Sequence, residues 1–249
     1  MEYRPRLTKN EYDLIKEFRN RPNILVIGDT HIPFNHPKYL DFCRSVQEKY
    51  RCSTVIHIGD ECDNAALSYH EKPPEAHAPE SEAELALKEL QNWYRAFPEV
   101  KVCVGNHSAL PFRQAQTAGI PKRFLRTYEE IWEAPKGWKW ELEWTINDCI
   151  FTHGTGTSGQ QAAIKRAILN QQSTIIGHTH SFGGVNYIAS KNNLIFGLNV
   201  GCGIDIDAYA FAYGRNYPRR PTLGCGVVLD NGGCGLFIPM DLGSKYVYK

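Results

Sequence analysis

Five short stretches of the chain carry side chains that can bind metal ions, and each lies where an apolar run ends. They are Gly28-Asp29-Thr30-His31, Gly59-Asp60-Glu61-Cys62-Asp63-Asn64, Gly105-Asn106-His107, His153-Gly154 and Gly177-His178-Thr179-His180. Ligands of α/β proteins bind beyond the carboxyl ends of strands, so Asp, Asn and His at these ends can converge on one point. The glycines let the backbone turn sharply and leave room for a metal ion or a phosphate.

The donor types in these stretches indicate which metal ions would suit them. Apart from Asp63 and His107, the candidates are two aspartates, one asparagine and four histidines. A mixed oxygen and nitrogen set without thiolate suits manganese, iron, zinc or nickel, whereas calcium and magnesium prefer more oxygen. Seven donors are too many for one ion with an open position, so the set predicts two ions that share a carboxylate. Two divalent ions roughly 3.5–4 Å apart form a clamp for displacement at phosphorus.

Hydrophobic periodicity predicts the elements that must position these residues. Buried strands are expected at Asn23–Ile27, Thr54–Ile58, Val100–Val104 and Ser173–Ile176, and helices at Pro37–Tyr50, Pro79–Phe97 and Ser158–Asn170. Ser81 followed by Glu84 fits a capping box in the second of these helices. Trp138–Ile146 and Cys149–Thr152 are predicted to form a hairpin joined near Asn147-Asp148. Further strands are expected at Val185–Ala189, Leu194–Leu198, Gly224–Leu229 and Leu236–Pro239.

Length and composition favour one α/β domain over residues 1–249, with residues 1–22 as a charged lead-in. The formal net charge of +1 excludes a globally basic nucleic-acid binder, so such binding would need local patches. No stretch approaches 18 consecutive apolar residues, which excludes a membrane span and a membrane partner. The eight cysteines form no C-x-x-C pair, and the N-terminus lacks the apolar core of a signal peptide. We therefore expect reduced thiols and a cytoplasmic location.

The five stretches contain, in order, the motifs Asp-x-His, Gly-Asp-x-x-Asp, Gly-Asn-His, His-Gly and Gly-His-Thr-His. This series resembles the calcineurin-like metallophosphoesterases, and the resemblance covers residues 24 to 180. It implies an α/β sandwich of two sheets flanked by helices (αββα) and two divalent metal ions. We expect manganese first, with iron, zinc or nickel as alternatives. The implied ligands are Asp29, His31 and His180 for the first ion, Asn106, His153 and His178 for the second, and Asp60 as the bridge.

The resemblance also implies catalytic roles for His107 and Asp63. The histidine of Gly-Asn-His faces the substrate in such enzymes and stabilises or protonates the leaving oxygen. Asp63 is similar to the carboxylate that orients this histidine in some members. The family usually has Asp or Glu directly after Gly-Asn-His, but here Ser108 follows. Serine carries no charge, and we hypothesise that Asp63 supplies the orientation instead.

The sequence also suggests where a substrate would bind. Asn64 occupies the place where the protein Ser/Thr phosphatase branch has an arginine that grips phosphate, which argues against a phosphoprotein phosphatase. The candidate substrate-binding residues are Asn64, Arg215 and Arg219, and the candidate recognition insertions are 108–137 and 205–222. The first insertion contains Arg113, Lys122, Arg123 and Arg126 with Phe112 and Phe124 interleaved. This basic run is either a solvated helix face or a contact for substrate phosphate or a nucleic-acid backbone.

Together these residues predict a binuclear metal-dependent phosphodiesterase. A metal-bridging hydroxide would attack phosphorus, and His107 would assist the leaving group. The phosphate-ester substrate could be a nucleic acid, a cyclic nucleotide or another small diester. One alternative is a phosphomonoesterase that acts on nucleotides or small phosphates. A second alternative is a non-catalytic interaction module on the same fold, which would be expected to lose ligands or His107.

Overall fold

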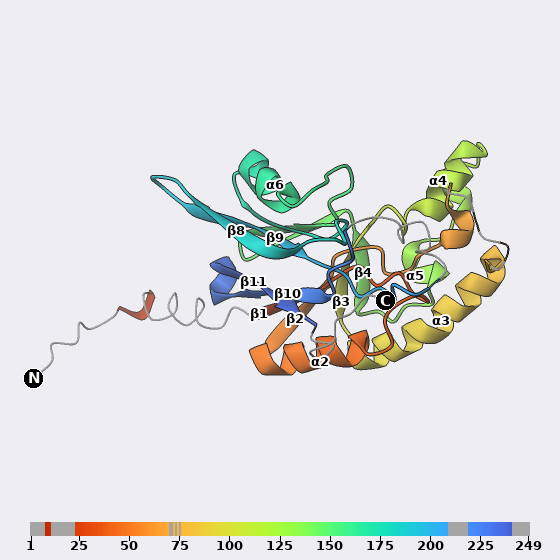
Figure 1. Ribbon diagram of the computed structural model, residues 1–249, viewed down its shortest axis with the longest axis horizontal. Coiled ribbons are helices and arrows are strands. Elements are labelled where there is room, and N and C mark those ends of the chain that lie inside the picture. The colour runs from red at the N-terminus through yellow and green to blue at the C-terminus, as the bar shows by residue number, and fades with distance from the viewer. Residues whose placement is uncertain are drawn as a thin grey trace, which may run out of the picture.

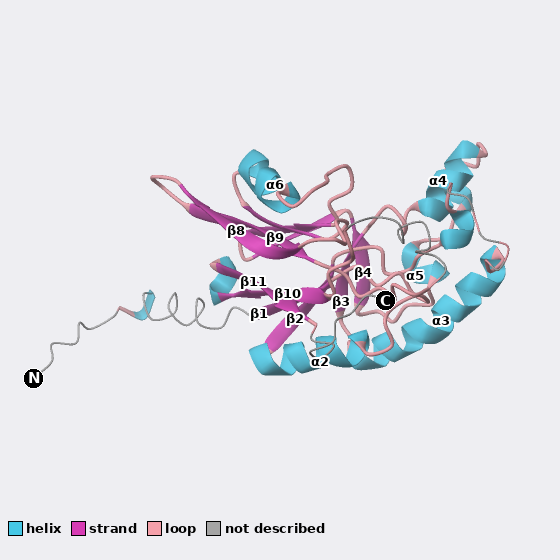
Figure 2. Cartoon of the chain, viewed as in Figure 1, coloured by secondary structure: helices cyan, strands magenta, loops and turns pink. Residues whose placement is uncertain are grey.

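The computed structural model describes residues 8–10, 23–69, 72, 74, 76–208 and 219–240. In this part of the chain two β-sheets lie face to face, and the longer helices lie outside them (Figures 1 and 2). The predicted α/β fold of two sheets flanked by helices is confirmed. Most of the predicted lead-in at 1–22 lies outside the described residues.

The first sheet has six strands in the order β11-β10-β1-β2-β3-β4. Their bounds are β1 Asn23–Ile27, β2 Cys52–His57, β3 Val100–Cys103, β4 Trp138–Glu141, β10 Gly224–Leu229 and β11 Cys234–Pro239. The four strands β1 to β4 run parallel, so their carboxyl ends meet at one edge. Strand β10 returns late in the chain and pairs with β1 in antiparallel fashion, and β11 pairs antiparallel with β10.

The second sheet has five strands in the order β5-β6-β7-β9-β8. Their bounds are β5 Glu143–Ile146, β6 Cys149–Thr152, β7 Ser173–Ile176, β8 Gly183–Ala189 and β9 Leu194–Val200. Strands β6, β7 and β9 are parallel, which gives this sheet a shared carboxyl edge as well. The predicted hairpin turn is confirmed between β5 and β6, where Asn147 and Asp148 both have positive φ.

Alternating side chains of β1 fill two separate cores, because successive residues of a strand point to opposite faces. Ile24 and Val26 pack between the two sheets. Leu25 and Ile27 pack on the opposite face, against the helices α2 (Tyr39–Tyr50) and α3 (Pro79–Ala96). Helix α6 (Ala162–Asn170) covers the outer face of the second sheet, as Figure 2 shows. A strand buried on both faces is apolar throughout, which explains why the sequence marks it so clearly.

The remaining elements lie in the connections that follow β2, β3 and β10. They are the 3-10 helices η1 (Ala65–Leu67), η2 (Lys122–Phe124) and η4 (Asp230–Gly232), and the helices α4 (Leu110–Thr117) and α5 (Tyr128–Ile131). Helices α4, η2 and α5 therefore make up half of the predicted insertion 108–137. Thr127 and Glu130 form a capping box at the start of α5, which the sequence analysis did not identify.

Two local predictions are wrong. Helix α3 begins at Pro79 after Ala78, so Ser81 lies inside its first turn and caps nothing with Glu84. Proline at the first helical position is pre-organised for a helix start, which explains why the helix begins at the predicted Pro79 rather than after Ser81. Trp138–Ile146 is not one strand, because β4 ends at Glu141 and β5 begins in the other sheet. Leu142, which connects them, is 75% exposed.

Other buried residues of the described chain have structural roles. His57 is buried, and its Nε2 lies 2.9 Å from Oγ1 of Thr30, which is a packing role. Trp138 and Trp140 both belong to the core, as their alternation on one strand predicts. All eight cysteines are free thiols. No helix in the described part of the chain is long and apolar enough to cross a membrane.

Candidate metal centre

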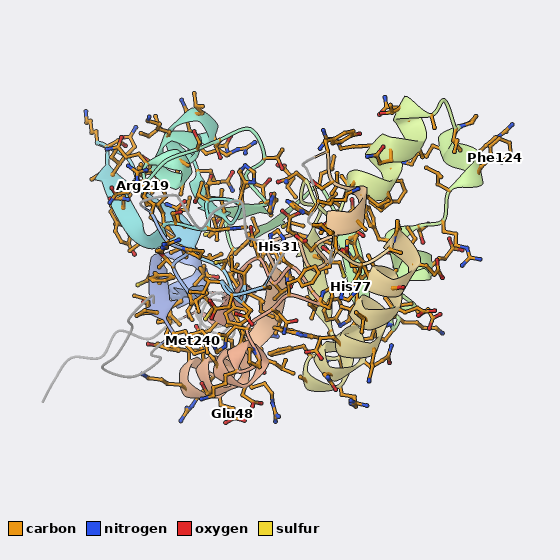
Figure 3. All side chains as sticks on the ribbon, turned by 45° about the vertical axis from the view of Figure 1, so that its right-hand side comes forward. His31, Glu48, His77, Phe124, Arg219 and Met240 are labelled. Carbon is orange, nitrogen blue, oxygen red and sulfur yellow. The ribbon has the colours of Figure 1, made fainter. Side chains whose placement is uncertain are left out.

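The seven predicted ligands meet where strands of both sheets end. Asp29, Asp60 and Asn106 follow β1, β2 and β3 of the first sheet, and His153 and His178 follow β6 and β7 of the second. Figure 3 shows His31 near the middle of the molecule. Because the two sheets present their carboxyl edges on the same side, side chains far apart in sequence converge there.

The first cluster contains Asp29, His31 and His180. Nε2 of His180 lies 3.0 Å from Oδ2 of Asp29 and 3.1 Å from Nε2 of His31. Asp29 and His31 are buried, whereas His180 is half-buried. These three side chains could hold one metal ion.

The second cluster contains Asp60, Asn106, His153 and His178. Nε2 of His153 lies 3.0 Å from both Oδ2 of Asp60 and Oδ1 of Asn106. The ring of His178 lies edge-on to that of His153, with centroids 5.1 Å apart. Oδ2 of Asp60 is also 3.9 Å from Nε2 of His31, so Asp60 lies between the two clusters, where a bridging ligand is expected.

The chemistry of the two clusters fits divalent cations. Oδ1 of Asp29 is buried and has no hydrogen-bond partner, and an uncompensated buried carboxylate is costly. Cations would offset the charges of Asp29 and Asp60 and would find oxygen and imidazole donors around them. Three residues in the clusters, His31, Asp60 and His178, also have positive φ, a strained conformation that tends to occur at functional sites.

In the metal-free centre, a proton on His153 offsets part of the negative charge of Asp60 and Asp29. Burial acts to lower the pKa of His153, but the charges of Asp60 and Asp29 raise this pKa to about 9. Burial acts to raise the pKa of Asp60, but the charge of His153 and its hydrogen bond hold it well below the ordinary value. A metal ion that binds His153 must therefore displace a proton.

His107 and Asp63 are in direct contact beside the first cluster. Nδ1 of His107 lies 3.1 Å from Oδ1 of Asp63 and 2.7 Å from the carbonyl oxygen of the same residue. Burial acts to lower the pKa of His107, but the Asp63 hydrogen bond and nearby carboxylate charges raise it to about 9. Burial acts to raise the pKa of Asp63, but hydrogen bonds and charges of His107 and His31 lower this pKa to about 2. The hypothesis that Asp63 orients His107 therefore agrees with the geometry.

Ser108 and Glu61 contribute to the centre in a way that sequence reasoning missed. Oγ of Ser108 accepts from the backbone N–H groups of Asp60, at 3.2 Å, and of Gly105, at 3.3 Å. The same hydroxyl donates to Oε2 of Glu61 at 2.6 Å, and Oε1 of Glu61 accepts from the indole N–H of Trp140. Burial raises the pKa of Glu61 to about 7. An acidic residue directly after Asp60 was the available sequence signal, and in the structure its carboxylate is the hydrogen-bond partner of Ser108.

Gly105 and Gly177 leave room for the two central carboxylates. A Cβ atom on Gly105 would lie 2.0 Å from Oδ1 of Asp60, and one on Gly177 would lie 2.1 Å from Oδ1 of Asp29. The sequence analysis expected these glycines to leave room for a metal ion or a phosphate. The structure shows that they accommodate the carboxylates of the predicted ligands.

The predicted substrate-binding residues have different surroundings. The side-chain amide of Asn64 donates to the carbonyl oxygen of His107 at 3.0 Å, so it supports the loop that carries this histidine. The guanidinium of Arg219 lies 5.1 Å from the ring centre of Phe182, two residues beyond His180. Arg215 lies outside the described residues, as does most of the predicted insertion 205–222. Substrate binding by these residues stays a prediction.

Comparisons with known proteins found a family model and several solved structures that resemble this chain. The family model of calcineurin-like phosphoesterases matches residues 22–181. Vacuolar Protein Sorting 29 from Cryptosporidium parvum is 13% identical, over 83% of this chain and 85% of that chain, with a TM-score of 0.43. YfcE, a phosphoesterase from E. coli, is 12% identical, over 86% of this chain and 96% of that chain, with a TM-score of 0.37.

The nuclease MPE of Pseudomonas putida is 13% identical, over 85% of each chain, with a TM-score of 0.34. No curated protein sequence matches this chain. The family model covers all five motifs and well over half of the chain. This protein belongs to the calcineurin-like phosphoesterase family.

Proposed function

We propose that this protein is a metal-dependent phosphodiesterase with a centre for two divalent cations, of which manganese is the first expectation. The observation that carries the proposal is the convergence of seven oxygen and nitrogen donors from the ends of five strands. Asp60 lies between the two clusters, within 3.0 Å of His153 and 3.9 Å of His31. Two clusters that meet at a carboxylate are suited to two ions rather than one.

The division of labour follows from the chemistry of phosphate esters, which are negatively charged and repel nucleophiles. Cations bound by the seven donors would neutralise this charge and lower the pKa of a water molecule, so that hydroxide is available near neutral pH. In the metal-free centre the pKa of His107 is raised to about 9, so the ring holds a proton at neutral pH, and its proposed role is to give this proton to the leaving oxygen. Asp63 binds the Nδ1 side of the ring, which leaves Nε2 to face the substrate.

A diester substrate is favoured over a monoester by the surroundings of Asn64. A monoester carries more charge on its terminal phosphate and therefore gains more from a guanidinium group beside the metal ions. Position 64 has an amide instead, and this amide is occupied by the carbonyl oxygen of His107. A diester has less charge to compensate, so the absence of an arginine there affects it less.

The test compares hydrolysis of bis-p-nitrophenyl phosphate and p-nitrophenyl phosphate by the purified protein with manganese, iron, zinc or nickel. We expect turnover of the diester. Asp60→Asn should lower the metal content, whereas His107→Ala should keep the metal and reduce turnover by about 10²–10⁴-fold. Turnover of the monoester alone would replace the proposal with a phosphomonoesterase. A wild-type protein that binds metal but hydrolyses neither ester would favour a non-catalytic interaction module.

A further inference from the structure

A segment of the insertion after His107 presents an aromatic ring to solvent far from the core. This segment, which we call the arm, consists of residues 110–126 and includes α4 and η2. Phe124 is 73% exposed, and Ile120 on the same arm is 44% exposed. Figure 3 shows Phe124 at the outer end of the molecule, well away from His31. The exposed ring of Phe124 offers an aromatic face on which a planar group of a ligand can stack.

The charged side chains of the arm are all cationic. Between Val102 and Tyr128 the sequence contains no aspartate or glutamate, and its charged residues are Arg113, Lys122, Arg123 and Arg126. All four are exposed. Among the described residues, no carboxylate forms an ion pair with Lys122, Arg123 or Arg126. The arm therefore combines an aromatic ring with uncompensated positive charge.

Contacts at its base attach the arm to the loop that carries Asp63 and Asn64. Helix α4 begins at Leu110, three residues after His107. The side-chain amide of Gln114 donates to the carbonyl oxygen of Leu67 at 2.7 Å, which ties α4 to η1. The guanidinium of Arg113 lies 5.4 Å from the ring centre of Tyr69. These contacts fix the base of the arm against the segment that follows Asp63 and Asn64.

We propose that the arm binds a single-stranded nucleic acid whose phosphodiester backbone continues into the metal centre. This inference rests on the proposed function and names its substrate class. An aromatic ring stacks on any base, and flanking lysine and arginine side chains contact the backbone phosphates. An acidic protein would satisfy the charges of Lys122, Arg123 and Arg126, but it would give Phe124 no base to stack on.

The length of the arm sets the length of strand that reaches it. Helix α4 has eight residues and is therefore about 12 Å long. Figure 3 places Phe124 well away from His31, so only a strand of several nucleotides can contact both the arm and the metal centre. A strand of about twelve nucleotides contacts Phe124, whereas a dinucleotide at the metal centre does not reach it.

The experiment measures binding of a fluorescent single strand of about twelve thymidine nucleotides, made resistant to cleavage by phosphorothioate linkages, to the manganese-loaded protein. Phe124→Ala should weaken binding about 5- to 100-fold, which is the contribution of one stacked base, and Phe124→Tyr should retain it. The combined Lys122→Ala, Arg123→Ala and Arg126→Ala variant should reduce the slope of log K against log salt by about 2, which is about 0.7 per phosphate contact. Lys191→Ala, at an exposed lysine between β8 and β9, is the control for the loss of a single positive charge outside the arm.

Melting temperatures establish that each variant is folded. Wild-type affinity in Phe124→Ala, or a salt slope in the triple variant equal to that of Lys191→Ala, would overturn the inference. Competition by polyglutamate as effective as that by the unlabelled strand would also overturn it, because binding would then need only negative charge. Turnover of bis-p-nitrophenyl phosphate by the wild type tests the proposed function separately. If the wild type hydrolyses this diester but the arm substitutions do not affect binding of the strand, the inference is disproved and the proposed function still stands.

Discussion

The carboxylate of Asp63 lies 3.1 Å from Nδ1 of His107, and the same oxygen contacts Nδ1 of His31. One buried acid therefore orients two imidazole rings with different roles. His31 presents its Nε2 to His180 and Asp60 in the candidate metal centre. Carboxylates that hold the far nitrogen of a metal-binding histidine fix its tautomer, and here the same group also holds the proposed proton donor.

Asp63→Asn should shift the alkaline limit of activity. The charge of Asp63 helps to raise the pKa of His107 to about 9, and activity that needs the protonated ring is lost as pH rises through that pKa. Bound cations act in the opposite direction, so the limb is expected at pH 9 or below. Removal of the Asp63 charge lowers the pKa further, and the limb moves to lower pH. The measurement is the pH profile of kcat for bis-p-nitrophenyl phosphate, with the exposed Asp41→Asn as control. An unchanged limb would contradict the role of Asp63.

Ser108 and Glu61 should be energetically coupled. Ser108→Ala leaves the Glu61 carboxylate and two backbone N–H groups without their partner, and each unsatisfied buried group costs about 1–3 kcal/mol. Ser108→Asp, which restores the acid common in the family, should also destabilise, because it places a second carboxyl group against Glu61. Glu61→Gln in the Ser108→Asp background should recover part of this loss. Denaturant unfolding of the wild type, Ser108→Asp, Glu61→Gln and the double variant gives the coupling free energy. Additive effects on the free energy of unfolding would show that the two positions are independent.

The pH dependence of stability should also report on Glu61. Its pKa is raised by burial from 4.5 to about 7, so the stability that its protonated form contributes is complete below about pH 4.5. This contribution is lost as pH rises through about 7. Glutamine resembles the protonated acid, so wild type should lose stability relative to Glu61→Gln between these two pH values. Melting temperatures at pH 5 and pH 8 provide the comparison, and a constant difference would mean that Glu61 does not titrate in this range.

Gly105→Ala and Gly177→Ala should weaken metal binding, because each substitution displaces a carboxylate of the candidate metal centre. Each new methyl group would lie about 2 Å from an oxygen of Asp60 or Asp29, and these carboxylates must move away to accommodate it. Gly119→Ala is the control, because it has open space around it and is penalised only by its positive φ, at about 1 kcal/mol. Metal content after dialysis should fall for the first two variants and stay at the wild-type level for the third. Full metal content in Gly105→Ala would show that the predicted position of Asp60 is not needed.

Addition of a divalent cation to the metal-free protein should release protons. His153 is protonated at pH 7 because Asp60 and Asp29 raise its pKa to about 9, and only the neutral ring can bind a metal ion. Calorimetric titrations with manganese should therefore give an enthalpy that depends on the ionisation enthalpy of the buffer at pH 7. Metal at 100 times its dissociation constant should also stabilise the protein by about 2.7 kcal/mol. An enthalpy that is the same in all buffers would contradict the charge state assigned to His153.

The sequence alone was sufficient to predict the fold class, most of the strands and the set of residues that meet. Strands β1 and β7 have the predicted bounds, because each is a short apolar run that is buried on both faces and followed by glycine. The donors of the candidate centre could be listed for the same reason, since they directly follow such strands. Parallel strands bring their carboxyl ends together whatever the details of packing, so residue type and position were enough.

Only the tertiary structure determined what these residues contact. The hydroxyl of Ser108 and the carboxylate of Glu61 are 47 residues apart in sequence, and no local pattern predicts their hydrogen bond. The change of sheet at Leu142 depends on which partner strand each half of Trp138–Ile146 finds, because the alternation of side chains is the same in one strand or two. Periodicity in a sequence records which side chains are buried. The groups that they are buried against follow from the packing of the two sheets.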